Sequence, residues 1–296
     1  MSQILTLIGS KNTDLTQSQV QAVAQAVGAP HAPDWLKPGH ACDLALDTTD
    51  RETVLDKARK ALGSAAIDVV VQPTGHRRKK LLIADMDSTV IEQECIDELA
   101  DALGLRDAIS TITERAMRGE LEFAPALRER VALLKGLAET ELQRVYDTQI
   151  TEMPGGRALC ATMKKHGGTC ALVSGGFTFF TSRIAAAVGF TSNQANTLMV
   201  ADGRLTGEVA EPILGREAKL TALKKLSKEL NLDPLETMAV GDGANDLAMI
   251  GEAGLGVAFH AKPIVGKAAA AQVNHGDLSA LLYIQGYRVD DIVTTS

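Results

Sequence analysis

Two aspartates, Asp85 and Asp87, directly follow an apolar run at residues 81–84, and a hydroxyl residue, Thr89, comes two positions later. The apolar run has the character of a buried strand. In an open α/β sheet, ligands bind just outside the carboxyl ends of the strands, and the N-terminus of a following helix favours phosphate. This arrangement suits an enzyme in which one carboxylate attacks a phosphoryl group and forms an aspartyl phosphate.

Three further features lie later in the chain, in the order Ser174-Gly-Gly176, Lys219 and Gly241-Asp-Gly-Ala-Asn-Asp246. Each is ordinary by itself, because Gly-Asp-Gly is common in turns, Ser-Gly-Gly can simply end a strand, and a single helix lysine is usually solvated. Together with the two aspartates, and in this order, they form a far more specific pattern.

The chemistry of phosphoryl transfer gives these residues distinct roles. A divalent cation held by Asp85 and Asp242 would remove the repulsion between the attacking carboxylate and the phosphate, and Mg²⁺ prefers such oxygen ligands. The Ser174 hydroxyl, the Gly175 N–H and the Lys219 ammonium would surround the equatorial oxygens of the transferred group. Mg²⁺ is therefore the expected cofactor.

Asp87 is the expected proton carrier. It would protonate the departing alkoxide and then deprotonate the water that hydrolyses the aspartyl phosphate. This requires a protonated Asp87 at the start, which the like charge of Asp85 favours because it raises one carboxyl pKa. Asn245 would orient the substrate, whereas Asp246 would either hold metal-bound water or cap the helix that starts at Leu247.

The composition predicts a soluble α/β protein of about two domains. The chain has 296 residues, 45% of them apolar, and a formal charge of −7, which argues against nucleic acid as the main partner. Four cysteines without paired or metal-site spacing indicate reduced, buried thiols, and no apolar run reaches the ~18 residues of a membrane span. The N-terminus lacks the features of a signal peptide, so we expect a cytoplasmic protein without a membrane partner.

Two domains are expected. Residues 1–75 alternate as a small α+β unit, whereas residues 76–296 show strands alternating with helices, which implies a parallel sheet. In the first unit we expect strands at 4–8, 40–46 and 67–72 and helices at 17–27 and 51–62. In the second we expect strands at 81–84, 169–173, 237–240 and 254–259, and a hairpin at 198–206 that turns at Asp202-Gly203.

A long helical stretch, residues 94–149, separates the first two strands of the second domain. Its caps and charges indicate several helices, so we expect an inserted cap at about residues 92–152 instead of a single crossover. The insert ends near Pro154, which is placed to start the next helix. The expected fold is a Rossmann-like core with a parallel sheet and a helical cap, preceded by the small α+β domain.

The four motifs, in their order along the chain, resemble those of the haloacid dehalogenase-like phosphatases. Within this superfamily the sequence resembles the phosphoserine phosphatases over roughly residues 80–285. The likeness rests on the first motif with Glu94 nine residues after the first aspartate, on two segments that look like cap helices, residues 118–123 and 127–134, and on residues 241–249.

That resemblance implies Mg²⁺-dependent hydrolysis of O-phospho-L-serine to L-serine and phosphate, the last step of serine biosynthesis. It implies that Glu94 pairs with the substrate ammonium and that Arg130 clamps the substrate carboxylate. Without it, both would be taken as solvated charges, and periodicity does not separate Arg130 from Arg128. The implied metal ligands are Asp85, the backbone carbonyl of Asp87, and Asp242.

Two alternatives remain open. One is a phosphotransferase, or a phosphatase for another small phosphate ester, with the same core and a different cap. The other is an amino-acid-sensing regulatory protein in which residues 1–75 are the functional part. The pattern of this N-terminal unit resembles an ACT-like domain, which would bind an amino-acid effector or mediate a homodimer, and a purely structural role is equally open.

Overall fold

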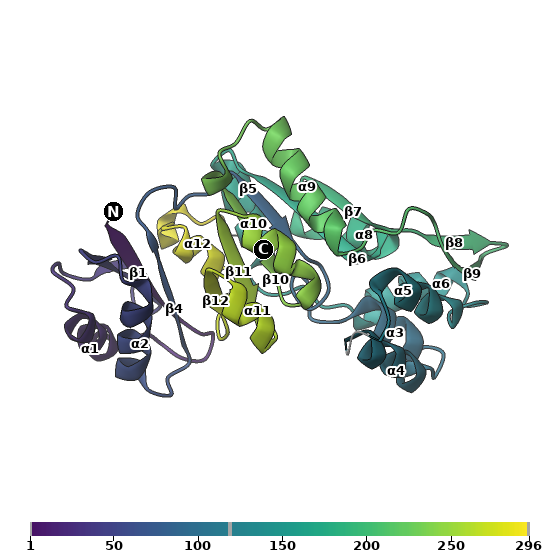
Figure 1. Ribbon diagram of the computed structural model, residues 1–296, viewed down its shortest axis with the longest axis horizontal. Helices are drawn as coiled ribbons and strands as arrows, with labels where there is room; N and C mark the ends of the chain where they lie inside the picture. Colours follow the sequence, from purple (N-terminus) through teal and green to yellow (C-terminus); the bar gives the residue numbers. More distant parts are fainter. Residues whose placement is uncertain (1, 118–119, 295–296) are drawn as a thin grey trace.

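The computed structural model describes residues 2–117 and 120–294, so Arg118 and Gly119 of the predicted cap segment lie outside the described residues. A four-stranded sheet, a six-stranded sheet and a group of helices follow one another along the long axis of the molecule (Figure 1). Within the described residues, no helix is both long enough and apolar enough to cross a membrane.

The N-terminal unit is an antiparallel sheet in the order β2-β3-β1-β4, built from a βαββαβ chain, which is the ferredoxin-like arrangement. Its elements are β1 (Gln3–Gly9), α1 (Gln17–Val27), β2 (Asp34–Lys37), β3 (Ala41–Leu46), α2 (Arg51–Leu62) and β4 (Ile67–Pro73). The five predicted elements are confirmed. Strand β2 was not predicted, because four residues flanked by Pro33 and Pro38 show no clear alternation.

Both faces of this N-terminal sheet are covered. Helices α1 and α2 pack on one face, where their apolar side chains and those of the strands form a separate core. On the other face, Ile8, Leu36, Ala41 and Val70 belong to the same core cluster as the second domain. The N-terminal unit therefore packs firmly against the rest of the molecule through its sheet.

The six strands of the second sheet are all parallel, in the order β12-β11-β10-β5-β6-β7, which confirms the predicted α/β core. The strands are β5 (Leu81–Ala84), β6 (Thr169–Phe177), β7 (Ser192–Asn196), β10 (Thr237–Gly241), β11 (Leu255–Phe259) and β12 (Ala271–Val273). The helices are α7 (Gly156–Lys165), α8 (Thr178–Val188), α9 (Arg216–Glu229), α10 (Leu247–Glu252), α11 (Pro263–Ala268) and α12 (Ala280–Ile284). Because β5 and β10 are neighbours, the loops that follow them meet at one edge of the sheet.

The predicted helical stretch contains α3 (Cys95–Asp101), α4 (Arg106–Met117), α5 (Phe123–Ala132) and α6 (Glu139–Gln149), which lie together beyond the sheet (Figure 1). The predicted hairpin consists of β8 (Leu198–Ala201) and β9 (Arg204–Val209), and it turns at Asp202 and Gly203, both with positive φ. Helix α7 begins after Pro154 and not at it, because Gly155 turns the chain with a φ of 83°. Short 3₁₀ turns occupy Pro234–Glu236, Ala244–Asp246 and Val289–Asp291.

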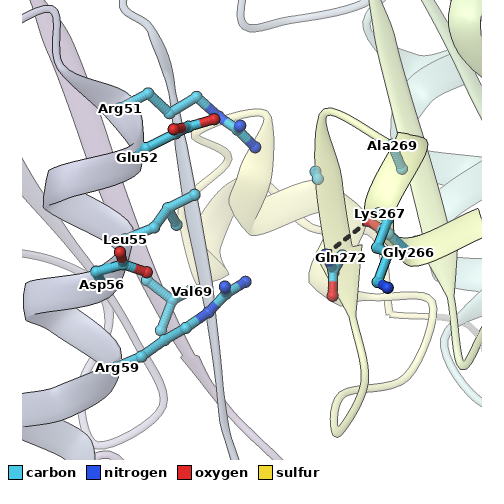
Figure 2. A pocket seen from close by; sticks show the side chains of 11 residues that line it. Arg51, Glu52, Leu55, Asp56, Arg59, Val69, Gly266, Lys267, Ala269 and Gln272 are labelled. Atoms are coloured by element: carbon cyan, nitrogen blue, oxygen red, sulfur yellow. Dashed lines mark hydrogen bonds between the residues drawn. The ribbon is translucent and has the colours of Figure 1, made fainter. Parts of the chain in front are cut away.

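A polar cleft of about 260 Å³ separates α2 from the α11–β12 segment (Figure 2). Arg51 and Arg59 line one wall, and Lys267 and Gln272 line the other. Arg51 spans the cleft, since its guanidinium donates to the carbonyl of Ala270. None of the residues with a predicted role lines this cleft, so the candidate active site lies elsewhere, at the carboxyl ends of β5 and β10.

Candidate active site

Asp85 lies immediately after β5, near the centre of the parallel sheet, and only 4% of it is exposed. Its N–H donates to the carbonyl of Val240 on the neighbouring strand β10, at 3.0 Å. Its Oδ1 accepts the N–H of Met86 at 2.8 Å, while Oδ2 faces Lys219. The carboxylate is thus fixed at the edge of the sheet where the loops after β5 and β10 meet.

Lys219, from α9, is buried between two carboxylates. Its Nζ lies 2.6 Å from Asp85 Oδ2 and 2.6 Å from Asp246 Oδ1. Burial alone would lower the pKa of this ammonium, but the charges of Asp85 and Asp246 outweigh burial and raise it. Lys219 therefore stays charged and places a cation directly beside Asp85.

Asp87 is held by donors from two other elements. Its Oδ1 accepts the N–H of Cys95 at 2.9 Å, and its Oδ2 accepts the hydroxyl of Ser174 at 3.2 Å. Burial and the charge of Asp85 raise the pKa of Asp87 to about 6. A carboxyl group with such a pKa can both give and take a proton near neutral pH. Gly176 leaves room for it, since a Cβ there would lie 2.7 Å from Asp87 Oδ2.

Three carboxylates gather at this edge of the sheet. Asp85, Asp242 and Asp246 each offer an oxygen, and these oxygens lie within 4.8 Å of one another. Burial, and after it the charge of Asp85, raise the pKa of Asp242 to about 6. Three carboxylates placed this close together offer hard oxygen ligands and negative charge, which suit a hard divalent cation. The residues present therefore fit the metal expected from the sequence.

Asp246 has a more definite place than the sequence indicated. Its Oδ1 lies 2.6 Å from Lys219 Nζ, and its Oδ2 accepts the N–H of Gly243 at 3.1 Å. Its side chain makes no capping hydrogen bond to α10. Burial and the charge of Asp85 raise the pKa of Asp246 to about 7. Asp246 thus ties Lys219 to the loop after β10, and on the same loop Asn245 Nδ2 donates to Asp85 Oδ2 at 3.5 Å.

Glu94 and Arg130 come from the helical insert. Ser88 donates to Glu94 Oε1 at 2.7 Å. Loss of hydration around the carboxyl group and the charge of Asp87 raise the pKa of Glu94 to about 7, although the residue as a whole is exposed. Burial lowers the pKa of the Arg130 guanidinium, and the negative charges of Asp97, Glu94 and Asp87 offset only part of this decrease. The insert therefore contributes one carboxylate and one guanidinium whose charges interact with that of Asp87.

The structure also separates the two arginines that periodicity could not. Arg128 lies on the exposed side of α5, with 53% of its side chain accessible, and pairs with Glu211. Arg130 is half-buried, and its Nε donates to the carbonyl of Ala126 at 3.3 Å. The charge of Arg130 interacts with those of Asp97, Glu94 and Asp87.

This geometry has counterparts among known proteins. The model of the haloacid dehalogenase-like hydrolase family matches residues 82–251, more than half of the chain. The chain belongs to this family. The hydrolase is 40% identical over 238 residues to a phosphoserine phosphatase from Archaeoglobus fulgidus, and the aligned region covers 80% of this chain and 69% of that protein.

Solved structures agree with this placement. The crystal structure of a probable phosphoserine phosphatase from Vibrio cholerae has a TM-score of 0.80 and 32% identity, and the match covers 98% of this hydrolase and 88% of that chain. A phospho-aspartyl intermediate analogue of phosphoserine phosphatase has a TM-score of 0.65 and 39% identity, over 70% and 98% of the two chains. The hydrolase is therefore an enzyme of the phosphatase type.

Phe123, the first residue of α5, belongs to the site of this hydrolase but was not singled out from the sequence. A Cβ on Gly175 would lie 3.0 Å from the Phe123 ring, and a Cβ on Gly215 would lie 3.1 Å from it. The ring of Phe123 thus packs between the insert and the core, next to Gly175 and Gly215. The chain has only six phenylalanines, so one among the charges of residues 118–123 was an available signal.

Proposed function

We propose that the enzyme hydrolyses O-phospho-L-serine to L-serine and phosphate, with Mg²⁺ and through an aspartyl phosphate on Asp85. The observation that carries the proposal is that the insert supplies a carboxylate, Glu94 at the start of α3, and a guanidinium, Arg130 in α5, whose charges both interact with that of Asp87. A phosphate ester with an ammonium and a carboxylate would find a partner for each group. The names of the relatives support the same substrate, which would make this the last step of serine biosynthesis.

The residues of the chain account for both chemical steps. Asp85 attacks phosphorus as the P–O bond to the serine oxygen breaks, and Asp87 protonates that departing oxygen. Asp87 then takes a proton from water, which attacks the aspartyl phosphate and releases phosphate and the Asp85 carboxylate. Lys219 and the Ser174 hydroxyl stabilise the charge that develops on the transferred group.

Mg²⁺ is the cation we propose for this site. Asp85, the backbone carbonyl of Asp87, and Asp242 would hold it. When bound, the cation would act as a Lewis acid that offsets the negative charge of the phosphate. Asn245 lies on the same loop as Asp242 and would orient the substrate, while Asp246 keeps Lys219 in place.

We also propose that residues 1–75 form an ACT-like domain and residues 76–296 the phosphatase domain, with a cap at about residues 92–152. The ferredoxin-like order of the N-terminal sheet supports the first assignment. An amino-acid effector of the N-terminal unit, a homodimer and a cytoplasmic location belong to the same proposal.

A substrate panel tests the proposal directly. We expect Mg²⁺-dependent phosphate release from phosphoserine to exceed, in kcat/KM, that from phosphothreonine and from sugar phosphates. Removal of the metal with a chelator should abolish the activity, and added Mg²⁺ should restore it. Equal rates on all esters would instead support the alternative of a phosphatase for another small ester, and transfer to an acceptor alcohol would support a phosphotransferase.

Arg130→Ala should lower kcat/KM for phosphoserine by about 30-fold or more, because it removes the partner of a partly buried carboxylate. The same variant should lose far less on 4-nitrophenyl phosphate, which carries no carboxylate. The matched control is Arg128→Ala on the same helix, whose exposed side chain pairs with Glu211. It should stay within about twofold of wild type on both substrates. Equal losses on the two esters in Arg130→Ala would contradict a carboxylate-binding role.

A further inference from the structure

Asp68 is a buried carboxylate of the N-terminal unit that contacts the second domain. It lies on β4 and is 2% exposed. Its Oδ1 accepts the N–H groups of Asn274 at 2.7 Å and of His275 at 3.2 Å, and its Oδ2 accepts the N–H of Gly276 at 2.8 Å. Successive N–H groups of this kind form a concave site for an anion. Asp68 therefore holds the turn that follows β12, the strand beside β4 in Figure 1.

The turn held by Asp68 leads directly to the end of the helical insert. Leu278, two residues beyond the turn, donates its N–H to the carbonyl of Pro154 at 3.0 Å. The adjacent Met153 donates to the carbonyl of Val90 at 2.8 Å, three residues after Asp87. The point at which the insert rejoins the core thus rests on the segment that Asp68 fixes.

The same turn also reaches the loop of the proposed metal site. The carbonyl of Gly276 lies 2.7 Å from Nε2 of His260, the residue that follows β11. Two residues later, the N–H of Lys262 donates to the backbone carbonyl of Asp242 at 3.1 Å. Gly276 approaches Asp68 closely, since a Cβ there would lie 3.1 Å from Asp68 Oδ2.

We propose that Asp68 is a positioning residue for the reaction. Through the turn at residues 274–276 it fixes both the end of the insert and the loop that carries Asp242. Asp68 touches no reacting atom, and its effect on the rate comes from geometry, to which phosphoryl transfer is sensitive. The inference rests on the proposed function, and it makes the N-terminal unit a part of the catalytic scaffold.

The first test is Asp68→Asn in the full chain. The substitution removes the charge and turns one acceptor into an amide donor that faces backbone N–H groups. We expect kcat to fall roughly tenfold and the Mg²⁺ concentration for half-activation to rise several-fold. KM should change less than kcat, because the hydrogen bonds of Glu94 to Ser88 and of Arg130 to Ala126 do not involve residues 274–276. Amide hydrogen exchange should accelerate at Leu278 and Lys262, which report the two connections.

Val23→Ala is the matched control. Val23 lies on α1 and is fully buried in the separate core of the N-terminal unit, away from residues 274–276. It should lower the unfolding midpoint while kcat stays within about twofold of wild type and exchange at Leu278 and Lys262 stays unchanged. If Asp68→Asn matches this control in kcat and in exchange, Asp68 is only a structural residue and the proposal is wrong.

A second variant keeps the test decisive if Asp68→Asn does not fold. His260→Ala breaks the connection to the loop of Asp242 from within the second domain, and it should raise the half-activating Mg²⁺ concentration and speed exchange at Lys262. Unchanged values would overturn that branch of the proposal. Exchange needs no substrate, so its outcome is independent of the substrate panel. If phosphoserine is not hydrolysed, kcat can be measured with 4-nitrophenyl phosphate.

Discussion

Asp85→Asn is expected to lower turnover by at least about 10⁴-fold, the scale of loss seen when a nucleophile is removed. An amide is a far weaker nucleophile than a carboxylate, and it no longer offers an anionic ligand to a cation. The change is nearly isosteric, and Lys219 keeps its contact with Asp246. The measurements are phosphate release and, in wild type quenched with acid, mass spectrometry of a phosphoryl adduct on the peptide that contains Asp85.

Asp202→Asn provides the control for this variant. Asp202 lies in the turn of the β8–β9 hairpin, is exposed and has a φ of 51°, a conformation that asparagine also adopts. Its kcat should stay close to that of wild type. An adduct that persists in Asp85→Asn would assign the nucleophile to another residue. Intact biological activity without turnover would instead favour the amino-acid-sensing alternative.

The acids of the site could be predicted because they follow parallel strands. Asp85 comes after β5 and Asp242 follows β10, and the two strands are hydrogen-bonded neighbours in the sheet. Apolar strands of four or five residues separated by helices predict such a sheet, and the carboxyl ends of its strands share one edge. The position of the pair thus followed from local pattern and from the geometry of parallel sheets.

Elements without a local pattern could not be predicted. Strand β7 has the polar sequence Ser-Asn-Gln-Ala-Asn, and β12 has only three residues, so neither shows strand periodicity. Both lie at the edges of the sheet, where pairing with a neighbour and not composition makes the strand. The contact of Asp68 with residues 274–276 spans about 206 positions of the chain and has no sequence signal.

The contacts of Lys219 with Asp85 and Asp246 could not be predicted either, because they join segments that are far apart in the chain. The sequence assigned Lys219 to the phosphate and left Asp246 between two roles. The structure shows a buried ion pair between them, with Lys219 also paired to Asp85. Such a pair depends on how α9 packs against the loop after β10. Helical periodicity alone does not distinguish Lys219 from Lys224, which is 57% exposed and pairs with Glu252.

Lys219→Met should therefore have the second largest effect, with a loss in kcat of at least about 10²-fold and a loss of about 3 kcal/mol in the free energy of unfolding at pH 8. Without the ammonium, Asp85 and Asp246 face each other, and the pKa of Asp246, already about 7, rises further. A folded-state carboxyl pKa above the unfolded value means that the folded protein binds more protons, so the stability deficit should shrink as pH falls from 8 to 5. Denaturant unfolding at both pH values measures this.

Lys224→Met, on the same helix, is the control, and it should change neither kcat nor the free energy of unfolding appreciably. A pH-independent loss of stability in Lys219→Met would show that lost packing, and not charge, is responsible.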